Sequence, residues 1–205
     1  MLSIIEGRVL GCLLEKERTT PDQYPLSPNA LVLACNQSTS RDPVMNVEPY
    51  DAEAAITSMK TQGLARLVHP SHGQKVTRFR QVADEHFDWE PDEAAVMAML
   101  LLRGPQTLAE LRARTERMHP FESLDEVETT LRRLAGRDEP QAVLLERQPG
   151  QKELRWQQLL AEEAEIVPRH APVATSAQPS PLVTRVDELE ARVARLEAAL
   201  ADLLG

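Results

Sequence analysis

The chain has 205 residues, of which 42% are hydrophobic and 27% charged, and its formal net charge is −9. Seven aromatic residues favour a helical core over a β-sandwich, and the two cysteines cannot supply a disulfide framework or a four-ligand zinc site. No apolar stretch approaches the roughly 20 residues of a membrane-spanning helix, and Glu6 and Arg8 interrupt the first apolar run, so we expect a cytoplasmic protein without a targeting segment or a membrane partner.

The first part of the chain predicts three helices followed by a β-hairpin. Helical spacing of apolar residues and proline at helix starts predict helices over 3–17, 27–35 and 48–62. Alternating residues over 64–68 and 75–80 predict the two hairpin strands. The residues predicted to face inward are Ile5, Val9, Cys12, Leu13, Leu31, Ala52, Ala55, Ile56 and Met59.

The same order of elements recurs in the second part. A helix is predicted from Pro91 to Gly104, and capping boxes at 107–110 and 123–126 predict two more helix starts. Strands are predicted over 142–146 and 152–157. The residues predicted to face inward in these helices are Val96, Met99, Leu100, Leu101, Leu124, Val127, Leu131 and Leu134.

Three helices followed by a hairpin is the element order of a winged-helix domain. The sequence therefore predicts a mainly α protein with small β-hairpins (α+β), built from two tandem winged-helix domains over 1–83 and 84–160. A proline-rich linker is predicted over 161–181, because residues 166–181 hold four prolines among small polar residues. Both cysteines, Cys12 and Cys35, fall in apolar helical stretches and are expected to be buried free thiols.

The last segment, 182–205, has an unbroken heptad pattern. Leucine at each d position and mainly valine at a favour a parallel two-stranded coiled coil and hence a homodimer. Arg185 and Arg192 at g face the partner's Glu190 and Glu197 at e in this arrangement. The alternative is an amphipathic helix that packs against its own domain. The seam consists of Leu182, Val186, Leu189, Val193, Leu196, Leu200 and Leu203.

Charge is divided unevenly along the chain. Residues 1–83 carry a net +1, residues 84–157 a net −6 and residues 158–205 a net −4. The first domain therefore repels nucleic-acid phosphates least. Its predicted DNA-binding residues are Arg41, Lys60, Lys75, Arg78 and Arg80, and Arg112, Arg114 and Arg117 form a second basic patch in the second domain. Acidic first turns of both third helices weigh against DNA binding.

The sequence contains no constellation typical of an enzyme. There is no nucleophile elbow and no phosphate-cradling glycine loop. The one close histidine pair, His69 and His72, lies across a predicted turn without a third ligand, so we expect no metal site and no cofactor.

Several long motifs resemble an uncharacterised bacterial family, the YceH-like family. They include LGCLLEK at 10–16, YPLS at 24–27, ACNQ at 34–37 and LLRG at 101–104. The resemblance covers most of residues 1–160 and implies a pair of winged-helix domains with no established activity. The family pattern after the second helix is close to Asn-Gln-Lys-x-Asn-Arg, and this chain has Ser38 and Ser40 at the lysine and second asparagine positions.

The sequence thus predicts a non-enzymatic protein with a function of the transcription-regulator type, binding double-stranded DNA through the first domain. The alternative is a protein–protein adaptor whose winged helices do not bind DNA. An enzyme ranks third. Phosphate contacts distinguish the first two, because they make affinity fall with salt.

Overall fold

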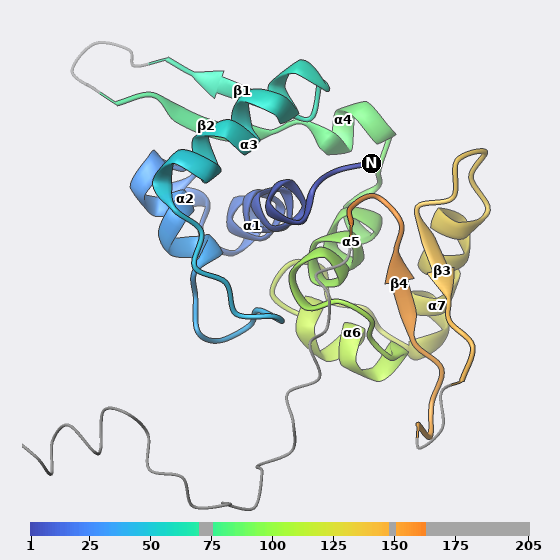
Figure 1. Ribbon diagram of the computed structural model, residues 1–205. Helices are drawn as coiled ribbons and strands as arrows, with labels where there is room; N and C mark the ends of the chain where they lie inside the picture. The colour runs from blue at the N-terminus through green and yellow to red at the C-terminus, as the bar shows by residue number, and fades with distance from the viewer. Residues whose placement is uncertain (70–75, 148–150, 163–205) are drawn as a thin grey trace, which may run out of the picture. The chain divides into compact units, whose positions relative to one another are not determined.

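The computed structural model describes residues 1–69, 76–147 and 151–162, all of which belong to one compact unit, Met1–Ile166. Figure 1 shows helices gathered around the centre of this unit, with two small hairpins at its periphery. The unit is mainly α-helical with two-stranded antiparallel sheets, which confirms the predicted fold class. The assignment of each half to the winged-helix class and the boundary at residue 83 stay predictions.

The first half contains three helices and a hairpin. The helices are α1 (Ile4–Thr19), α2 (Pro28–Cys35) and α3 (Pro49–Thr61), and a short 3-10 helix, η1 (Pro21–Gln23), precedes α2. Ser27 caps α2 by accepting the Ala30 N–H, with Pro28 at the first helical position, as the sequence predicts. The hairpin pairs β1 (Ala65–Val68) with β2 (Arg78–Gln81), Ala65 lying opposite Gln81.

The second half repeats that order after a connecting helix, α4 (Ala83–Phe87). Its helices are α5 (Pro91–Arg103), α6 (Leu108–Thr115) and α7 (Leu124–Ala135), and its hairpin pairs β3 (Ala142–Leu144) with β4 (Trp156–Gln158). The capping box of α6 forms between Thr107 and Glu110, as predicted.

An additional bridge strengthens the repeat. Leu26, just before α2, exchanges two backbone hydrogen bonds with Phe79 of β2, at 3.0 and 2.7 Å. Gln106, just before α6, exchanges the equivalent pair with Trp156 of β4, at 3.0 and 2.8 Å. Both halves thus join the start of their second helix to the second hairpin strand, although their sequences share little.

The two halves share one hydrophobic core, because their first helices, α1 and α5, pack against each other. Glycines on α1 permit this contact. A Cβ on Gly7 would lie 2.7 Å from the Ala161 Cβ, and a Cβ on Gly11 would lie 2.9 Å from Leu102 Cγ. The chain ends of the unit also meet, since Leu2 donates to the Leu160 carbonyl and Glu162 donates back to Leu2.

Most predicted core positions are buried, and a few are not. Leu124 is exposed rather than inward, because it occupies the first position of α7, outside the stripe that contacts α5 and α6. Ile5 and Leu101 are only half-buried. At Ser123 the predicted capping box is half formed: Ser123 accepts the Glu126 N–H, but the Glu126 carboxylate accepts from Glu122.

The cysteine prediction is confirmed as far as bonding and burial go, since Cys12 and Cys35 are both free and buried. The predicted linker after residue 162, the heptad segment, Lys75 and His72 lie outside the described residues. None of the helices in the described ranges is long and apolar enough to cross a membrane.

Candidate functional site

The structure removes Arg41 from the predicted DNA-binding surface. Its side chain is 0% exposed, and its guanidinium binds the Glu15 carboxylate at 2.7 Å and donates to the Ala34 carbonyl at 3.0 Å. Burial alone raises the pKa of Glu15, but the hydrogen bond and charge of Arg41 outweigh it and hold the pKa below its ordinary value. Arg41 thus fixes the loop after α2 onto α1, and our expectation that it contacts phosphate is corrected.

The other predicted cations lie around the first hairpin. Lys60 is exposed near the end of α3. Arg78 donates to the Pro25 carbonyl at 2.9 Å, and Arg80 pairs with Glu85 of α4 at 2.9 Å. Glu85 also lies 3.4 Å from Arg66. A neighbouring carboxylate therefore partly neutralises the basic surface that we predicted.

The arginines of the second basic patch also form ion pairs and hydrogen bonds with neighbouring carboxylates and carbonyls. Arg114 pairs with Glu110 at 3.3 Å, and Arg112 donates to the carbonyls of Phe121 and Glu122. Arg117 donates to a carbonyl at the end of α1. The predicted basic patch is therefore largely engaged in holding its own half together.

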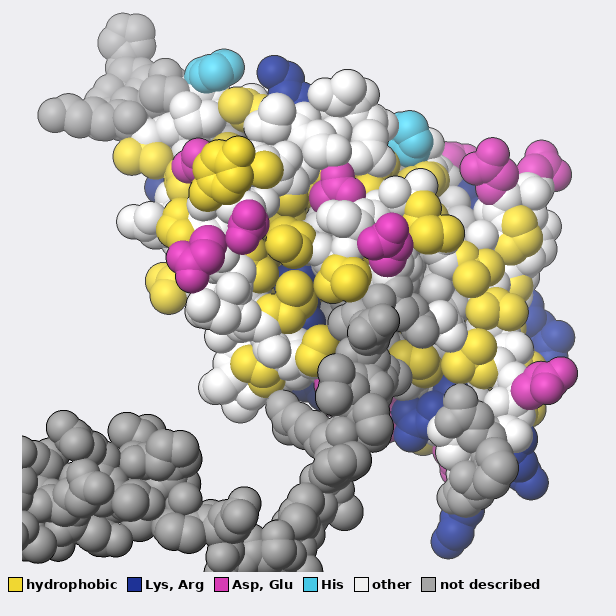
Figure 2. All heavy atoms as spheres, viewed as in Figure 1, with side chains coloured by type: hydrophobic (Ala, Val, Ile, Leu, Met, Phe, Trp, Pro, Cys, Tyr) yellow, Lys and Arg dark blue, Asp and Glu magenta, His cyan; other side chains and the backbone are white. Residues whose placement is uncertain are grey.

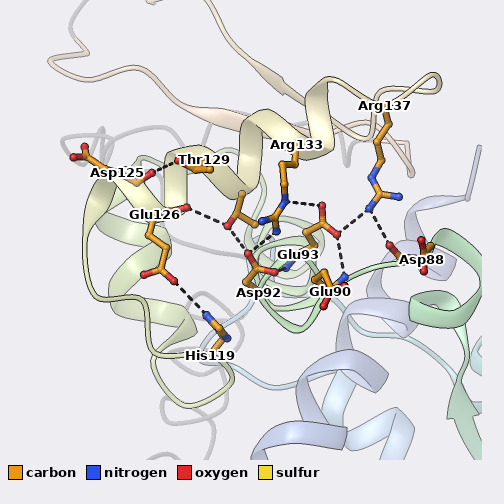
Figure 3. A network of polar contacts seen from close by, with 11 residues as sticks. Asp88, Glu90, Asp92, Glu93, His119, Asp125, Glu126, Thr129, Arg133 and Arg137 are labelled. Atoms are coloured by element: carbon orange, nitrogen blue, oxygen red, sulfur yellow. Dashed lines mark hydrogen bonds and ion pairs between the residues drawn. The ribbon is translucent and has the colours of Figure 1, made fainter.

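A network of ion pairs and hydrogen bonds between arginines and carboxylates also joins α5 to α7 (Figure 3). Arg133 reaches Asp92 at 2.6 Å and Glu93 at 3.4 Å, and Arg137 pairs with Glu93 at 2.8 Å. The Thr130 hydroxyl donates to Asp92 at 2.6 Å. Burial raises the pKa of Asp92, but the hydrogen bonds from Thr130 and Arg133 outweigh this and hold the pKa below its ordinary value, so the carboxylate stays ionised.

The first turns of the outer face of α3 are apolar and acidic, and the one cation of this helix, Lys60, lies in its last turn. Tyr50 is 80% exposed, and Glu53, Ala54 and Thr57 are exposed on successive turns behind it. Asp51 adds a carboxylate to the first turn of the same helix. Figure 2 shows hydrophobic side chains interspersed with carboxylates over α2 and α3. We call this the α2–α3 face.

On α2, this face carries Leu33, which is 72% exposed. Neither Leu33 nor Tyr50 was singled out from the sequence, although a signal exists. Leu33 is out of phase with the buried stripe Leu31, Ala34 and Cys35, so on a helix it has to point away from the core. A contiguous exposed apolar patch is typical of a binding site, and the helices that carry Leu33 and Tyr50, α2 and α3, pack against each other.

No group of three or more histidine, cysteine, aspartate or glutamate side chains with metal-binding geometry is present in the ranges that the structure describes. His69 is exposed at the end of β1, and His72 lies outside those ranges. The predicted absence of a cofactor stays a prediction.

Comparison with known proteins gives consistent results along the whole chain. The profile of a family described as "Protein of unknown function, DUF480" matches residues 2–151. A UPF0502 protein of Geobacter sulfurreducens is 43% identical over 203 residues, which cover 99% of this chain and 90% of that protein. A UPF0502 protein of Pseudomonas savastanoi is 44% identical over 207 residues, with 98% and 91% covered. A UPF0502 protein of Shewanella woodyi is 42% identical over 219 residues, with 99% of both chains covered.

Proposed function

The chain belongs to the uncharacterised YceH-like family described as DUF480, and from the geometry of its surface we propose that it is a non-catalytic adaptor that binds a protein partner through the α2–α3 face. One observation carries the proposal. In the predicted winged-helix arrangement the third helix is the element that enters a DNA groove, and here its exposed face presents Tyr50 and Ala54 next to Asp51 and Glu53.

Physical chemistry favours a protein over DNA on such a face. Carboxylates at the start of a helix repel phosphates, whereas an exposed tyrosine is a typical anchor of protein interfaces. The occupant that fits is a protein surface with an apolar centre to cover Leu33 and Tyr50, and with lysine or arginine at its rim to meet Asp51 and Glu53.

DNA binding is the second candidate, because one observation favours it. Lys60 is exposed, and Arg66 and Arg80 share the single carboxylate of Glu85, so the first hairpin keeps a local excess of positive charge. Regulator-type DNA binding through this hairpin needs Lys60 and Arg78 to reach phosphates while α3 stays at the edge of the groove.

Site-specific photo-crosslinking in the native host tests the adaptor. A photoreactive phenylalanine analogue replaces Tyr50 in one version of the full chain and Leu33 in a second. It replaces Leu154, an exposed leucine next to the second hairpin, in a control. We expect the same discrete protein adduct from Tyr50 and Leu33 and none from Leu154. Equal adducts from all three positions contradict the proposal.

A salt titration with duplex DNA tests the second candidate in parallel. Phosphate contacts make the logarithm of affinity fall linearly with the logarithm of salt concentration, by about 0.9 per contact. Absence of binding at about 50 mM salt removes the DNA candidate. A measurable slope that Lys60→Ala and Arg78→Ala flatten supports it instead and contradicts the adaptor.

A further inference from the structure

A cavity of about 290 Å³ lies between the two halves of the compact unit. Its walls come from α1, from the loop that follows α2, from the end of α5 and from the second hairpin and the residues after it. This volume is close to the lower end of the range for small-molecule sites, roughly 300–1,000 Å³. The cavity is therefore of a size for a metabolite.

Two arginines in this wall have an unsatisfied N–H. Among the described residues, the buried Nε atoms without a hydrogen-bond partner belong to Arg8, Arg18 and Arg103, and two of these, Arg8 and Arg103, line the cavity. A buried donor without a partner destabilises the fold, and more so in a charged group. Both Nε atoms are covered by protein atoms, so an acceptor in the cavity reaches them only after the two side chains rearrange.

Arg8 is the deeper of the two cations, with only 3% of the residue exposed. Its two terminal nitrogens donate to the carbonyls of Cys35 and Pro43, at 3.1 and 2.6 Å, and no carboxylate in the described part of the chain forms an ion pair with it. Burial lowers the pKa of Arg8 and the charge of Arg41 adds to this, while Cys12, Cys35 and Asp42 act in the opposite direction without outweighing them. The position of Arg8 is thus fixed by neutral carbonyls, and its charge is left without a counterion.

Arg103 is in a comparable electrostatic setting at the end of α5. Burial lowers its pKa first, and the positive charges of Arg114 and Arg41 lower it further. The third arginine of the wall, Arg155, is already satisfied, because it pairs with Glu110 and donates to the Pro105 carbonyl, both at 2.8 Å. The unmet positive charge of the cavity therefore belongs to Arg8 and Arg103.

The remaining charges of the wall offset it only in part, with Asp42 acting to raise the pKa of both arginines. Asp42, Glu146 and Glu162 also line the cavity, but all three residues are exposed, so water solvates their carboxylates. Apolar surface makes up much of the rest. It comes from Ile4, Met45, Leu100 and Leu101.

We propose that this cavity binds a small organic anion, whose carboxylate or phosphate accepts hydrogen bonds from Arg8 and Arg103 and whose apolar body contacts the leucines of α5. A guanidinium N–H donated to an ionised acceptor forms a charge-assisted hydrogen bond, stronger than one to water. Because both halves supply the wall, the bound anion links them and stabilises their packing. This site is independent of the α2–α3 face.

The test is an NMR titration of the full chain that follows the arginine Nε–H signals. The probes are benzoate, which has an apolar ring and a carboxylate, and benzamide, its neutral counterpart of nearly the same shape. We expect benzoate to shift the Arg8 and Arg103 signals saturably and to raise the unfolding temperature. Benzamide at equal concentration is expected to leave both signals in place.

Substitutions locate the site. Arg103→Gln is expected to weaken benzoate binding about tenfold or more, because a hydrogen bond to a charged group is lost. Arg132→Gln, on the exposed side of α7, is the matched control and is expected to bind benzoate as the native chain does. Arg8→Lys keeps the charge but removes the Nε donor and is also expected to weaken binding.

Three results overturn the proposal: no saturable shift at Arg8 and Arg103, equal shifts with benzamide, or Arg103→Gln binding benzoate as tightly as Arg132→Gln does. Circular dichroism confirms that each variant is folded. Arg103→Gln is well suited to this because Arg103 makes no side-chain hydrogen bond within the described residues.

Discussion

Glu15 shows how a single carboxylate links two segments of the chain. It lies 2.7 Å from the Arg41 guanidinium, whose side chain is fully buried. Glu15→Gln removes the charge that balances this cation, and loss of one partner of a buried pair costs about 3–5 kcal/mol. We therefore expect the free energy of unfolding at neutral pH, measured by urea denaturation, to fall by about 3 kcal/mol.

The pH dependence of this effect has a definite sign. The pKa of Glu15 is lower in the folded chain than in the unfolded one, so its contribution is present above the unfolded pKa. It is lost as the pH falls through the folded pKa, and the native chain and Glu15→Gln should converge in acid. A difference that grows on acidification contradicts the assignment.

Two other glutamates serve as controls. Burial raises the pKa of Glu17, so its charge costs stability at neutral pH, and Glu17→Gln should leave stability unchanged or increase it. Glu128 forms an exposed pair with Arg132 one turn away, and Glu128→Gln should change stability by less than about 0.5 kcal/mol. Equal losses in Glu15→Gln and Glu128→Gln indicate that burial of the pair is unimportant.

At the scale of elements, glycine in α1 is explained by packing rather than by helix propensity. Alanine favours a helix over glycine by about 1 kcal/mol, yet a Cβ at Gly7 would lie 2.7 Å from the Ala161 Cβ, which is fixed to the backbone. Overpacking costs about 1–3 kcal/mol. Gly7→Ala should therefore destabilise the chain by about 1 kcal/mol in thermal or urea unfolding. A more stable variant contradicts this packing.

The matched control for this prediction is an alanine on an exposed helix surface. Ala54 in the middle of α3 is exposed, so Ala54→Gly changes propensity without changing the core and should cost about 1 kcal/mol. Gly7→Ala adds a methyl group and the control removes one, yet both are expected to destabilise the chain. Helix propensity alone predicts instead that Gly7→Ala stabilises it.

How far the sequence predicts these elements depends on whether the signal is local. Ser27 and Thr107 begin helices as predicted, because a cap and its partner lie within one turn. The helix α4 was not predicted, since five residues carry too little periodicity. In the sequence, Arg8 is visible only as an interruption of an apolar run, because the groups that surround it come from segments far along the chain.

The candidate sites were harder to predict for the same reason. Burial of Arg41 depends on the loop after α2 folding back onto Glu15, and the cavity depends on α1 meeting α5 and the last described residues. No pattern within one element reports such contacts. Leu33 is the exception, since its phase on α2 was visible in the sequence.

At the scale of the whole molecule, the predicted homodimer rests on the heptads of 182–205, which lie outside the described residues. If Leu189 and Leu196 occupy d positions of a two-stranded seam, replacing both with glutamate places charges face to face in an apolar contact and separates the chains. We expect sedimentation to give a dimer for the native chain and a monomer for the double variant. Ala191→Glu, at an outward f position, is the control and should stay dimeric. A native chain that sediments as a monomer, or a double variant that remains a dimer, contradicts the coiled coil. Either result favours a helix that packs within one chain.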